Sequence, residues 1–224
     1  MELKFDLHVH TNASPDGVSS ALEIVEAAKA RGLDGVAITD HDVVMDSQSA
    51  SSLSERTGLI VIPGVEVSTY EGHLVILLPR RAVHAGIGLS NAVRMAIEGG
   101  SVPFIPHPTD PISHGVGEEA VVSLPYRLPI ESLNASTLSR YNRRAEELAN
   151  RLSLPKLASS DAHISRAVGD AYSLVSTEER SLDAAVEAIR SGRTSPRGGR
   201  TSFGIALECY WLKLLRRTNL KKSG

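Results

Sequence analysis

Two histidines close the first apolar run of the chain, within the stretch Asp6-Leu7-His8-Val9-His10-Thr11. Alternate side chains of a β-strand point to the same face, so His8 and His10 would project together, about 6.5 to 7 Å apart along the strand. Two neutral imidazoles on one face can clamp a metal ion. A strand with two ordinary surface histidines would show the same pattern, and the pair alone leaves both interpretations open.

Four more histidines fall at or just beyond the ends of predicted strands: His41, His73, His107 and His163. Carboxylates accompany them: Asp16, Asp40, Glu66 and Asp161. Histidine with carboxylate is the ligand set of Zn, Mn and Fe ions. The absence of paired cysteines excludes a structural zinc knot, so this set indicates a catalytic metal site. His84 and His114 lie outside these motifs, and we expect them to be ordinary loop residues.

The composition is that of an ordinary globular protein. The 224 residues, 42% of them hydrophobic, are enough for one full core. Cys209 is the lone cysteine, and Met1 leads directly into a charged strand rather than an apolar signal segment. No run approaches the length of a membrane span. We therefore expect a soluble, cytoplasmic protein with no membrane partner.

Positive charge gathers at the C-terminal end. Nine Lys or Arg follow residue 189, against Glu208 alone: Arg190, Arg193, Arg197, Arg200, Lys213, Arg216, Arg217, Lys221 and Lys222. The net charge of the whole chain is -2, so the body must be strongly acidic. A solvated basic end is the commoner explanation, and attraction for a polyanion such as nucleic acid is the alternative.

Short β-rich runs alternate with stretches of helical periodicity. Strands are predicted at 5–9, 35–39, 59–67, 73–78, 102–105, 131–134, 156–159 and 172–175. Helices are predicted from a capping box at Ser20 and Glu23, at 47–56, from Ser90 to 98, at 138–152 and from Ser181. A last amphipathic helix contains Trp211, and its Ile205, Leu207, Trp211 and Leu215 would pack on the body.

Repeated βα units predict parallel strands covered by helices. Ligands at the ends of strand after strand can meet only if those ends ring a common centre, which favours a barrel over an open sheet. Neither nucleotide-binding glycine motif is present, and no G-x-S-x-G motif occurs.

Several motifs in one order resemble the PHP family, the polymerase and histidinol phosphatase metal hydrolases. They are D-L-H-V-H-T, S-P-D-G, G-L-D-G-V-A-I-T-D-H, P-G-V-E-V-S, H-L-V, P-H-P, an Asn-bearing strand at Asn134, and S-S-D-A-H. The match covers roughly residues 3 to 175, and the joint occurrence is highly specific. The resemblance implies a distorted seven-stranded (β/α)7 barrel at residues 1–200, with metals at its C-terminal mouth, followed by a helix and basic tail at 201–224.

The resemblance also implies a ligand set for two to three divalent ions such as Mn, Zn or Fe. A first metal would take His8, His10, Glu66 and Asp161; a second would take Asp16, His41 and His163; and Glu66 would bridge to a third held by His73 and His107. Asp40 would orient a neighbouring imidazole. The chain departs from the family at Pro106 and at Leu78-Pro79, which leaves the ligands assigned but not the substrate.

The implied activity is hydrolysis of a phosphoester, on a phosphorylated small molecule or nucleotide, by a hydroxide bridging the metals. Glu66, Asp161 and His163 would be catalytic. Arg166 is the best candidate to bind the phosphate, ahead of Arg140, Arg143 and Arg144.

Three alternatives remain open. One is an exonuclease or phosphodiesterase that acts on nucleic-acid ends. Another is an amidohydrolase-type barrel, although Glu66 occupies the central strand where that superfamily usually has a carboxylated lysine. The last is a non-catalytic metal-binding accessory module that docks on nucleic acid through its basic tail.

Overall fold

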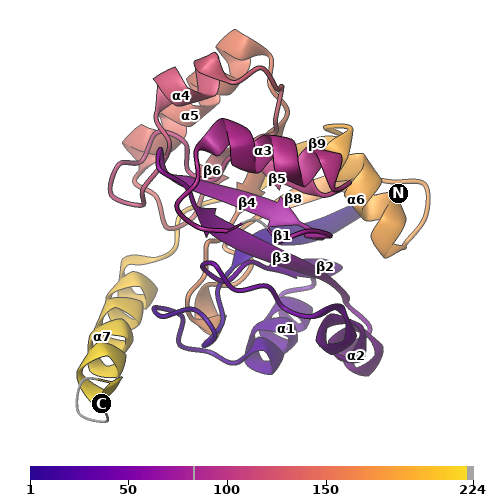
Figure 1. Ribbon diagram of the computed structural model, residues 1–224. Coiled ribbons are helices and arrows are strands. Elements are labelled where there is room, and N and C mark those ends of the chain that lie inside the picture. Colours follow the sequence, from indigo (N-terminus) through magenta and orange to yellow (C-terminus); the bar gives the residue numbers. More distant parts are fainter. Residues whose placement is uncertain (83, 221–224) are drawn as a thin grey trace.

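A curled sheet dominates the fold (Figure 1). The computed structural model describes residues 1–82 and 84–220, the last four of these by their backbone alone. Seven strands form one sheet in the order β5-β4-β3-β2-β1-β8-β9, and β6 pairs with β7 beside it. The strands are β1 Glu2–Val9, β2 Gly35–Ile38, β3 Ile60–Ser68, β4 His73–Leu77, β5 Val102–Phe104, β6 Ile130–Asn134, β7 Lys156–Ser159, β8 Ala171–Ser176 and β9 Thr194–Gly198.

The sheet is mixed, which departs from the expected alternation of parallel strands and helices. Strands β1, β2 and β3 run parallel, whereas β4 is antiparallel to both β3 and β5, and β8 is antiparallel to both β1 and β9. Only residues 69–72 connect β3 to β4. Because a parallel connection needs a crossover of a dozen or more residues, this short link forces an antiparallel pair. The fold is α/β with a curled sheet, and the (β/α)7 pattern is not observed.

Isolated bridges hold the β6–β7 pair against the larger sheet. Ile105, just beyond β5, bridges to Ile130 at the start of β6, and Val9 of β1 bridges to Ala162 beyond β7. Residues of β7 also hydrogen-bond to the other side of the sheet, where the amide of Ala158 donates to Ser173 Oγ. The sheet therefore wraps around a buried core that contains Phe5 and Phe104.

Helices cover the outside of the sheet. In the described residues they are α1 Ala21–Ala30, α2 Ser47–Thr57, α3 Leu89–Glu98, α4 Glu118–Ser123, α5 Ser139–Leu152, α6 Leu182–Arg190 and α7 Phe203–Leu220, with a 3-10 turn at Ser165–Ala167. In Figure 1, α1 and α2 lie on one side and α3 to α5 on the other. The capping box of Ser20 and Glu23 and the Ser181 cap are confirmed. The prediction of a Ser90 cap is wrong, because α3 begins at Leu89 after an N-cap at Gly88 that has no side chain to bond.

Helix α7 follows the sheet and projects beside it (Figure 1). Its residues Ile205, Cys209 and Leu212 pack against the core cluster beneath α1. That spacing of four and three residues is one stripe of a helix. The expected packing set was wrong for its other members, because Leu207, Trp211 and Leu215 lie off this stripe and are exposed.

Two of the basic residues counted at the C-terminal end, Lys221 and Lys222, lie outside the described residues, as does the side chain of Arg217. Within the part of the chain that is described, no helix combines the length and the hydropathy that a membrane crossing requires.

Candidate metal centre

The carboxyl ends of three parallel strands bring the first ligands together. His8 lies in β1 and His10 just beyond it, His41 follows β2, and Glu66 lies near the end of β3. His41 and Glu66 form an isolated bridge between neighbouring backbones. Parallel strands end at one edge of a sheet, so these side chains share one site.

The remaining histidines reach the same edge by other routes. Strand β4 is antiparallel to β3, and its first residue, His73, pairs with Ser68 at the end of β3. His107 follows β5, and Asp161 and His163 follow β7. His107 and Asp161 have positive φ values of 29° and 53°, which side-chain-bearing residues adopt rarely. Such strain is common at functional sites, where the surrounding structure enforces it.

Glu66 lies at the centre of the cluster and is only 1% exposed. Its Oε2 lies 3.2 Å from His8 Nε2, His10 Nε2 and His41 Nδ1. Its Oε1 lies 2.9 Å from His73 Nδ1 and 3.2 Å from His107 Nε2. One carboxylate therefore contacts five imidazoles, three with one oxygen and two with the other.

Two further carboxylates, Asp161 and Asp16, complete the cluster. Asp161 Oδ1 lies 3.3 Å from His10 Nε2. His163 Nε2 lies 2.9 Å from Asp16 Oδ2, and His41 Nε2 lies 3.9 Å from Asp16 Oδ1. The structure thus brings together all nine residues that the motifs indicated.

The donor atoms fall into four groups, each with all its atoms within 4.8 Å of one another. The groups are His10, Asp16, His41 and His163; His8, His10 and Glu66; His8, His107 and Asp161; and His41, Glu66 and His73. The group of His8, His10 and Glu66 corresponds to the expected first site, and the group that contains Asp16 corresponds to the expected second site. His107 differs, because it groups with His8 and Asp161 in addition to contacting Glu66.

Burial and charge shift the protonation equilibria in opposite directions. Burial disfavours the charged form of His10, but hydrogen bonds with Asp161 and Glu66 outweigh it and raise its pKa to about 9. Burial likewise opposes protonation of His8, whose pKa is nevertheless held well above its usual range by the charges of Glu66, Asp161 and Glu131. Burial dominates at His41 and lowers its pKa to about 4.

The residues fit a divalent-metal site. Asp16 Oδ1 and His107 Nδ1 are buried and have no hydrogen-bond partner, a condition that costs free energy unless another group satisfies it. Nε2 of His8 lies 3.0 Å from Nε2 of His10, so two ring nitrogens converge on one point. Imidazole nitrogens and carboxylate oxygens that converge in this way suit Zn, Mn or Fe.

A second layer of side chains orients the ligands, and sequence reasoning missed its main member. Glu131 of β6 is fully buried; its Oε1 lies 3.0 Å from His8 Nδ1, and its Oε2 accepts hydrogen bonds from the His107 amide and from Asn134 Nδ2. Asn134 Nδ2 also donates to Asp161 Oδ2. Asn134 was the one member of this layer that the sequence motifs indicated. Glu131 was missed because it lies 123 residues from His8, and nothing in the sequence shows that the two are in contact.

Asp40, expected to orient a neighbouring imidazole, acts on the histidines through Ser14. Its carboxylate accepts hydrogen bonds from the Thr11 amide and hydroxyl and from the Ser14 amide. Ser14 then contacts the histidines, because its Oγ accepts a bond from the His41 amide and lies 3.2 Å from His10 Nδ1. Asp40 therefore acts through the loop that follows β1.

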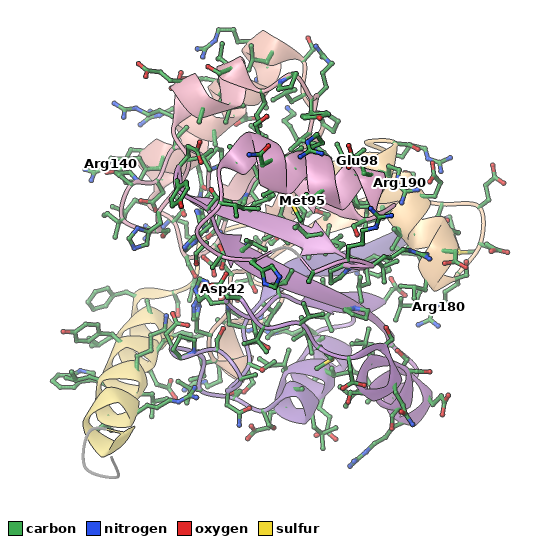
Figure 2. All side chains as sticks on the ribbon, viewed as in Figure 1. Asp42, Met95, Glu98, Arg140, Arg180 and Arg190 are labelled. Atoms are coloured by element: carbon green, nitrogen blue, oxygen red, sulfur yellow. The ribbon has the colours of Figure 1, made fainter. Side chains whose placement is uncertain are left out.

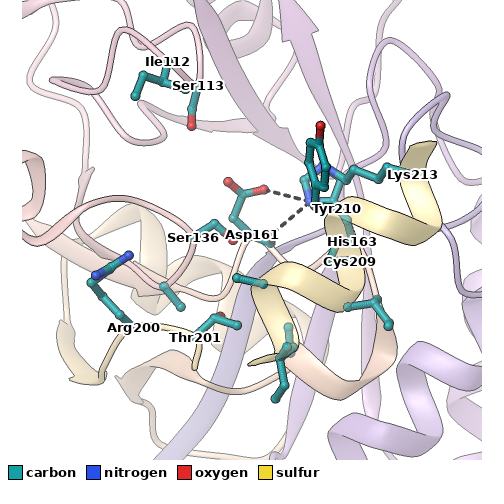
Figure 3. Close-up of a pocket in the computed structure, with 15 residues that line it drawn as sticks. Ile112, Ser113, Ser136, Asp161, His163, Arg200, Thr201, Cys209, Tyr210 and Lys213 are labelled. Carbon is teal, nitrogen blue, oxygen red and sulfur yellow. Dashed lines mark hydrogen bonds and ion pairs between the residues drawn. The ribbon is translucent and has the colours of Figure 1, made fainter. Parts of the chain in front are cut away.

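Two of the cavities at the cluster share part of their walls. A metal cavity of about 270 Å³ is lined by Asp16, His41, Glu66, His73, His107, Ile112, Ser113, His114, Asp161, His163 and Lys213. His114, expected to be an ordinary loop residue, is on its wall, with its ring centroid 5.4 Å from that of His73. A second cavity of about 430 Å³, here called the α7 pocket, shares Asp161, His163 and Lys213 with the first and extends along α7 to Arg200 (Figure 3).

Arg166 is not part of either cavity wall. Its guanidinium pairs with Glu208 of α7 and is 64% exposed. Arg140 projects outward near the start of α5 (Figure 2), where its guanidinium donates to the Tyr141 hydroxyl. Among the described residues, Lys213 is a cation on the wall of the metal cavity, and its Nζ lies 3.0 Å from Asp16 Oδ2.

Comparison with known proteins agrees with this geometry. The family described as PHP-associated matches residues 139–194. An uncharacterized protein of Methanocaldococcus jannaschii is 30% identical over 126 residues, which covers 52% of this chain and 74% of that protein. A 5'-3' exoribonuclease of Haemophilus influenzae is 42% identical over 73 residues, 32% of this chain and 26% of the enzyme. The chain thus spans about a quarter of the exoribonuclease.

The fold also resembles that of a known PHP-like protein. A crystal structure of a two-domain protein from Bacteroides vulgatus, containing a predicted PHP-like metal-dependent phosphoesterase, superposes with a TM-score of 0.67 at 22% identity, over 95% of this chain and 70% of the other. The relative from Methanocaldococcus jannaschii, of which the chain covers 74%, and the PHP-associated match together show that the chain belongs to the PHP family.

Proposed function

We propose that this protein hydrolyses a phosphoester of a small molecule or nucleotide, with two to three divalent ions held by the nine-residue cluster. The observation that carries the proposal is the position of Glu66, whose two oxygens face two different sets of imidazoles next to an open cavity. A carboxylate shared between ligand sets suits a multi-metal site, and such sites serve phosphoryl transfer.

The ligands would divide as the family resemblance implies. His8, His10, Glu66 and Asp161 would hold one ion; Asp16, His41 and His163 would hold another; and His73 and His107 would hold a third beside Glu66. Bound divalent ions supply Lewis acidity and lower the pKa of water towards neutrality. Mn, Zn and Fe all match this donor set.

The chain's own groups prepare the ligands for that role. His163 Nδ1 donates to the Asp161 carbonyl at 2.9 Å, which directs Nε2 towards Asp16 and the cavity. Glu131 accepts from His8 Nδ1 and so directs Nε2 of His8 inward. Glu66, Asp161 and His163 are the residues that we propose as catalytic, because each faces the cavity in which the phosphoester would lie.

The α7 pocket is suited to the organic part of the substrate. Its volume of about 430 Å³ lies within the usual range for small-molecule sites, about 300 to 1,000 Å³. Ile164, Ala167 and Ile205 give it an apolar wall, and Asp161 and His163 join it to the metal cavity. A phosphate bound at the cluster could therefore carry an organic group into this pocket.

Metal reconstitution tests the proposal. We expect protein stripped with a chelator to be inactive and protein reloaded with Mn to release phosphate from at least one member of a panel of phosphomonoesters and nucleotides. Elemental analysis should find two to three ions per chain. Full activity in the stripped protein, or a single ion per chain after reloading, would contradict the proposal.

A nuclease is the second candidate. It is favoured by the similarity to the exoribonuclease and by cations beside the cluster, with Lys213 at one end of the α7 pocket and Arg200 at the other (Figure 3). A panel that includes dinucleotides and short 5'-phosphorylated oligonucleotides separates the two. Release of mononucleotides in preference to inorganic phosphate would support the nuclease.

An amidohydrolase is not favoured by the geometry. The bridging position is occupied by Glu66, and Lys213 reaches the cluster from α7 rather than from a strand end.

A further inference from the structure

Helix α7 places one lysine inside the metal centre. Lys213 Nζ lies 3.0 Å from Asp16 Oδ2, and the side chain lines both the metal cavity and the α7 pocket. It is the only Lys or Arg among the described residues that line the metal cavity. Figure 3 shows it on α7, across from Asp161 and His163.

The position of Lys213 does not depend on its ion pair, because three other contacts hold α7. Glu208 pairs with Arg166, and Arg216 donates to the carbonyl of Asn12 at 2.6 Å. One stripe of α7, which includes Cys209, packs on the core. The helix would therefore keep presenting Lys213 to the cavity if the contact with Asp16 were lost.

Asp16 must change partners when the site is loaded. Its Oδ2 is shared by Lys213 and His163, and its Oδ1 has no hydrogen-bond partner. A carboxylate that ligates a divalent ion has less negative charge to offer a neighbouring ammonium group. Lys213 would then need another anion, and its flexible four-carbon stem allows the ammonium to turn towards the cavity.

We propose that Lys213 is a positioning residue for the phosphoryl oxygens of the substrate and that, in the metal-free protein, its ammonium group takes the place of a cation at Asp16. The inference rests on the proposed phosphoesterase function. The oxygens of a phosphoryl group at the cluster would not all contact the bound ions, and Lys213 supplies a positive charge at the side towards the α7 pocket. The organic part of the ester would leave along the same pocket.

This role predicts that replacing Lys213 changes the affinity for metal and the affinity for phosphate in different directions. Removing the ammonium group removes a competitor at Asp16, so metal affinity should stay equal or rise. The same change removes a partner of the phosphate, so phosphate affinity should fall. A residue that merely fixed the loop carrying Asp16 would lower both affinities when removed.

Calorimetry on the full chain can measure both quantities. Mn is titrated into stripped wild-type protein and the Lys213→Met variant, and inorganic phosphate is titrated into each after Mn loading. We expect phosphate to bind about tenfold or more weakly to Lys213→Met, a loss of roughly 1.4 kcal/mol, with Mn affinity unchanged or higher. Lys213→Arg, which keeps the charge, should restore most of the phosphate affinity.

Arg216→Met is the matched control, because it removes a cation one turn away that anchors α7 without lining either cavity. It should leave phosphate affinity near the wild-type value. Wild-type phosphate affinity in Lys213→Met, or a parallel fall of Mn and phosphate affinity, would overturn the role of Lys213. Failure of the Mn-loaded wild type itself to bind phosphate would instead overturn the proposed function, and the inference with it.

Discussion

Glu66 is the residue on which the ligand sets converge. Both of its oxygens are within 3.2 Å of imidazole nitrogens, and burial, which would raise its pKa, is outweighed by the surrounding histidines, so the carboxyl is held ionised. The central position was predictable from its motif. Its five simultaneous contacts were not, because they depend on the antiparallel β4, which aligns His73 with the ends of parallel strands.

Replacing Glu66 by Gln keeps the shape and removes the charge. We expect Glu66→Gln to lose metal per chain by elemental analysis and to lose activity by about 100-fold or more, and to be more affected than any single histidine variant. Glu98→Gln is the control, because Glu98 is an exposed partner of Arg94. Wild-type metal content and activity in Glu66→Gln would remove this residue from the centre of the mechanism.

The raised pKa values of His8 and His10 lead us to predict that metal binding releases protons. The pKa of His10 is raised to about 9 and that of His8 is raised well above its usual range, so protons compete with a metal ion for these imidazoles. A metal ligand must be the neutral imidazole, so binding displaces these protons and metal affinity should rise with pH up to about 9. Calorimetric titrations with Mn at pH 7, in two buffers of different ionisation enthalpy, should give different apparent enthalpies. Equal enthalpies would show that the imidazoles are already neutral.

At the scale of elements, the loop after β1 connects the sheet to the second ligand group. Asp40 accepts two hydrogen bonds from Thr11 and one from Ser14, and Ser14 contacts both His10 and His41. This loop carries Asp16, so Asp40 controls the geometry of a ligand that it does not touch.

Replacing Asp40 by Asn should disturb that loop without touching a ligand. We expect Asp40→Asn to lower the free energy of unfolding by about 1 to 3 kcal/mol and to lower the affinity for one of the bound ions more than for the others. Asp42→Asn is the control, because the Asp42 carboxylate accepts its hydrogen bonds from the amide and hydroxyl of Ser68. Urea unfolding and metal titration measure the two effects, and uniform weakening of every ion would show that Asp40 supports the fold alone.

Sequence patterns located most elements but not all. Capping residues marked α1 and α6, because the Ser side chains bond the free amides of the first turn. Strand β9 was not predicted, because Pro196 and Gly198 disfavour strands. Both residues are tolerated here because β9 lies at the edge of the sheet. Helix α4, at six residues, is too short to show a helical period.

At the scale of the whole molecule, the basic residues from Arg190 onward do not form one surface. Thr194 of β9 pairs with Val175, next to the start of β1, whereas Gly198 pairs with Ala171, towards the metal centre. Arg190 and Arg193 therefore lie at the far end of the sheet, and Arg190 donates to the Gly100 carbonyl. A count of charges along the sequence treats these residues as one patch, because it carries no information on strand direction.

This division predicts which cations a polyanion would contact. If a short 5'-phosphorylated oligonucleotide reaches the metal centre, the Arg197→Glu, Arg200→Glu double variant should bind it more weakly and show a salt dependence shallower by about 1 to 2 in the slope of log K against log salt. The Arg190→Glu, Arg193→Glu variant carries the same charge change at the far end and should keep the wild-type slope. Fluorescence anisotropy at several salt concentrations, in Ca²⁺ in place of Mn, would measure both. Equal losses in the two variants would indicate a nonspecific effect of net charge, and the absence of binding by the wild type would leave small phosphoesters as the substrates.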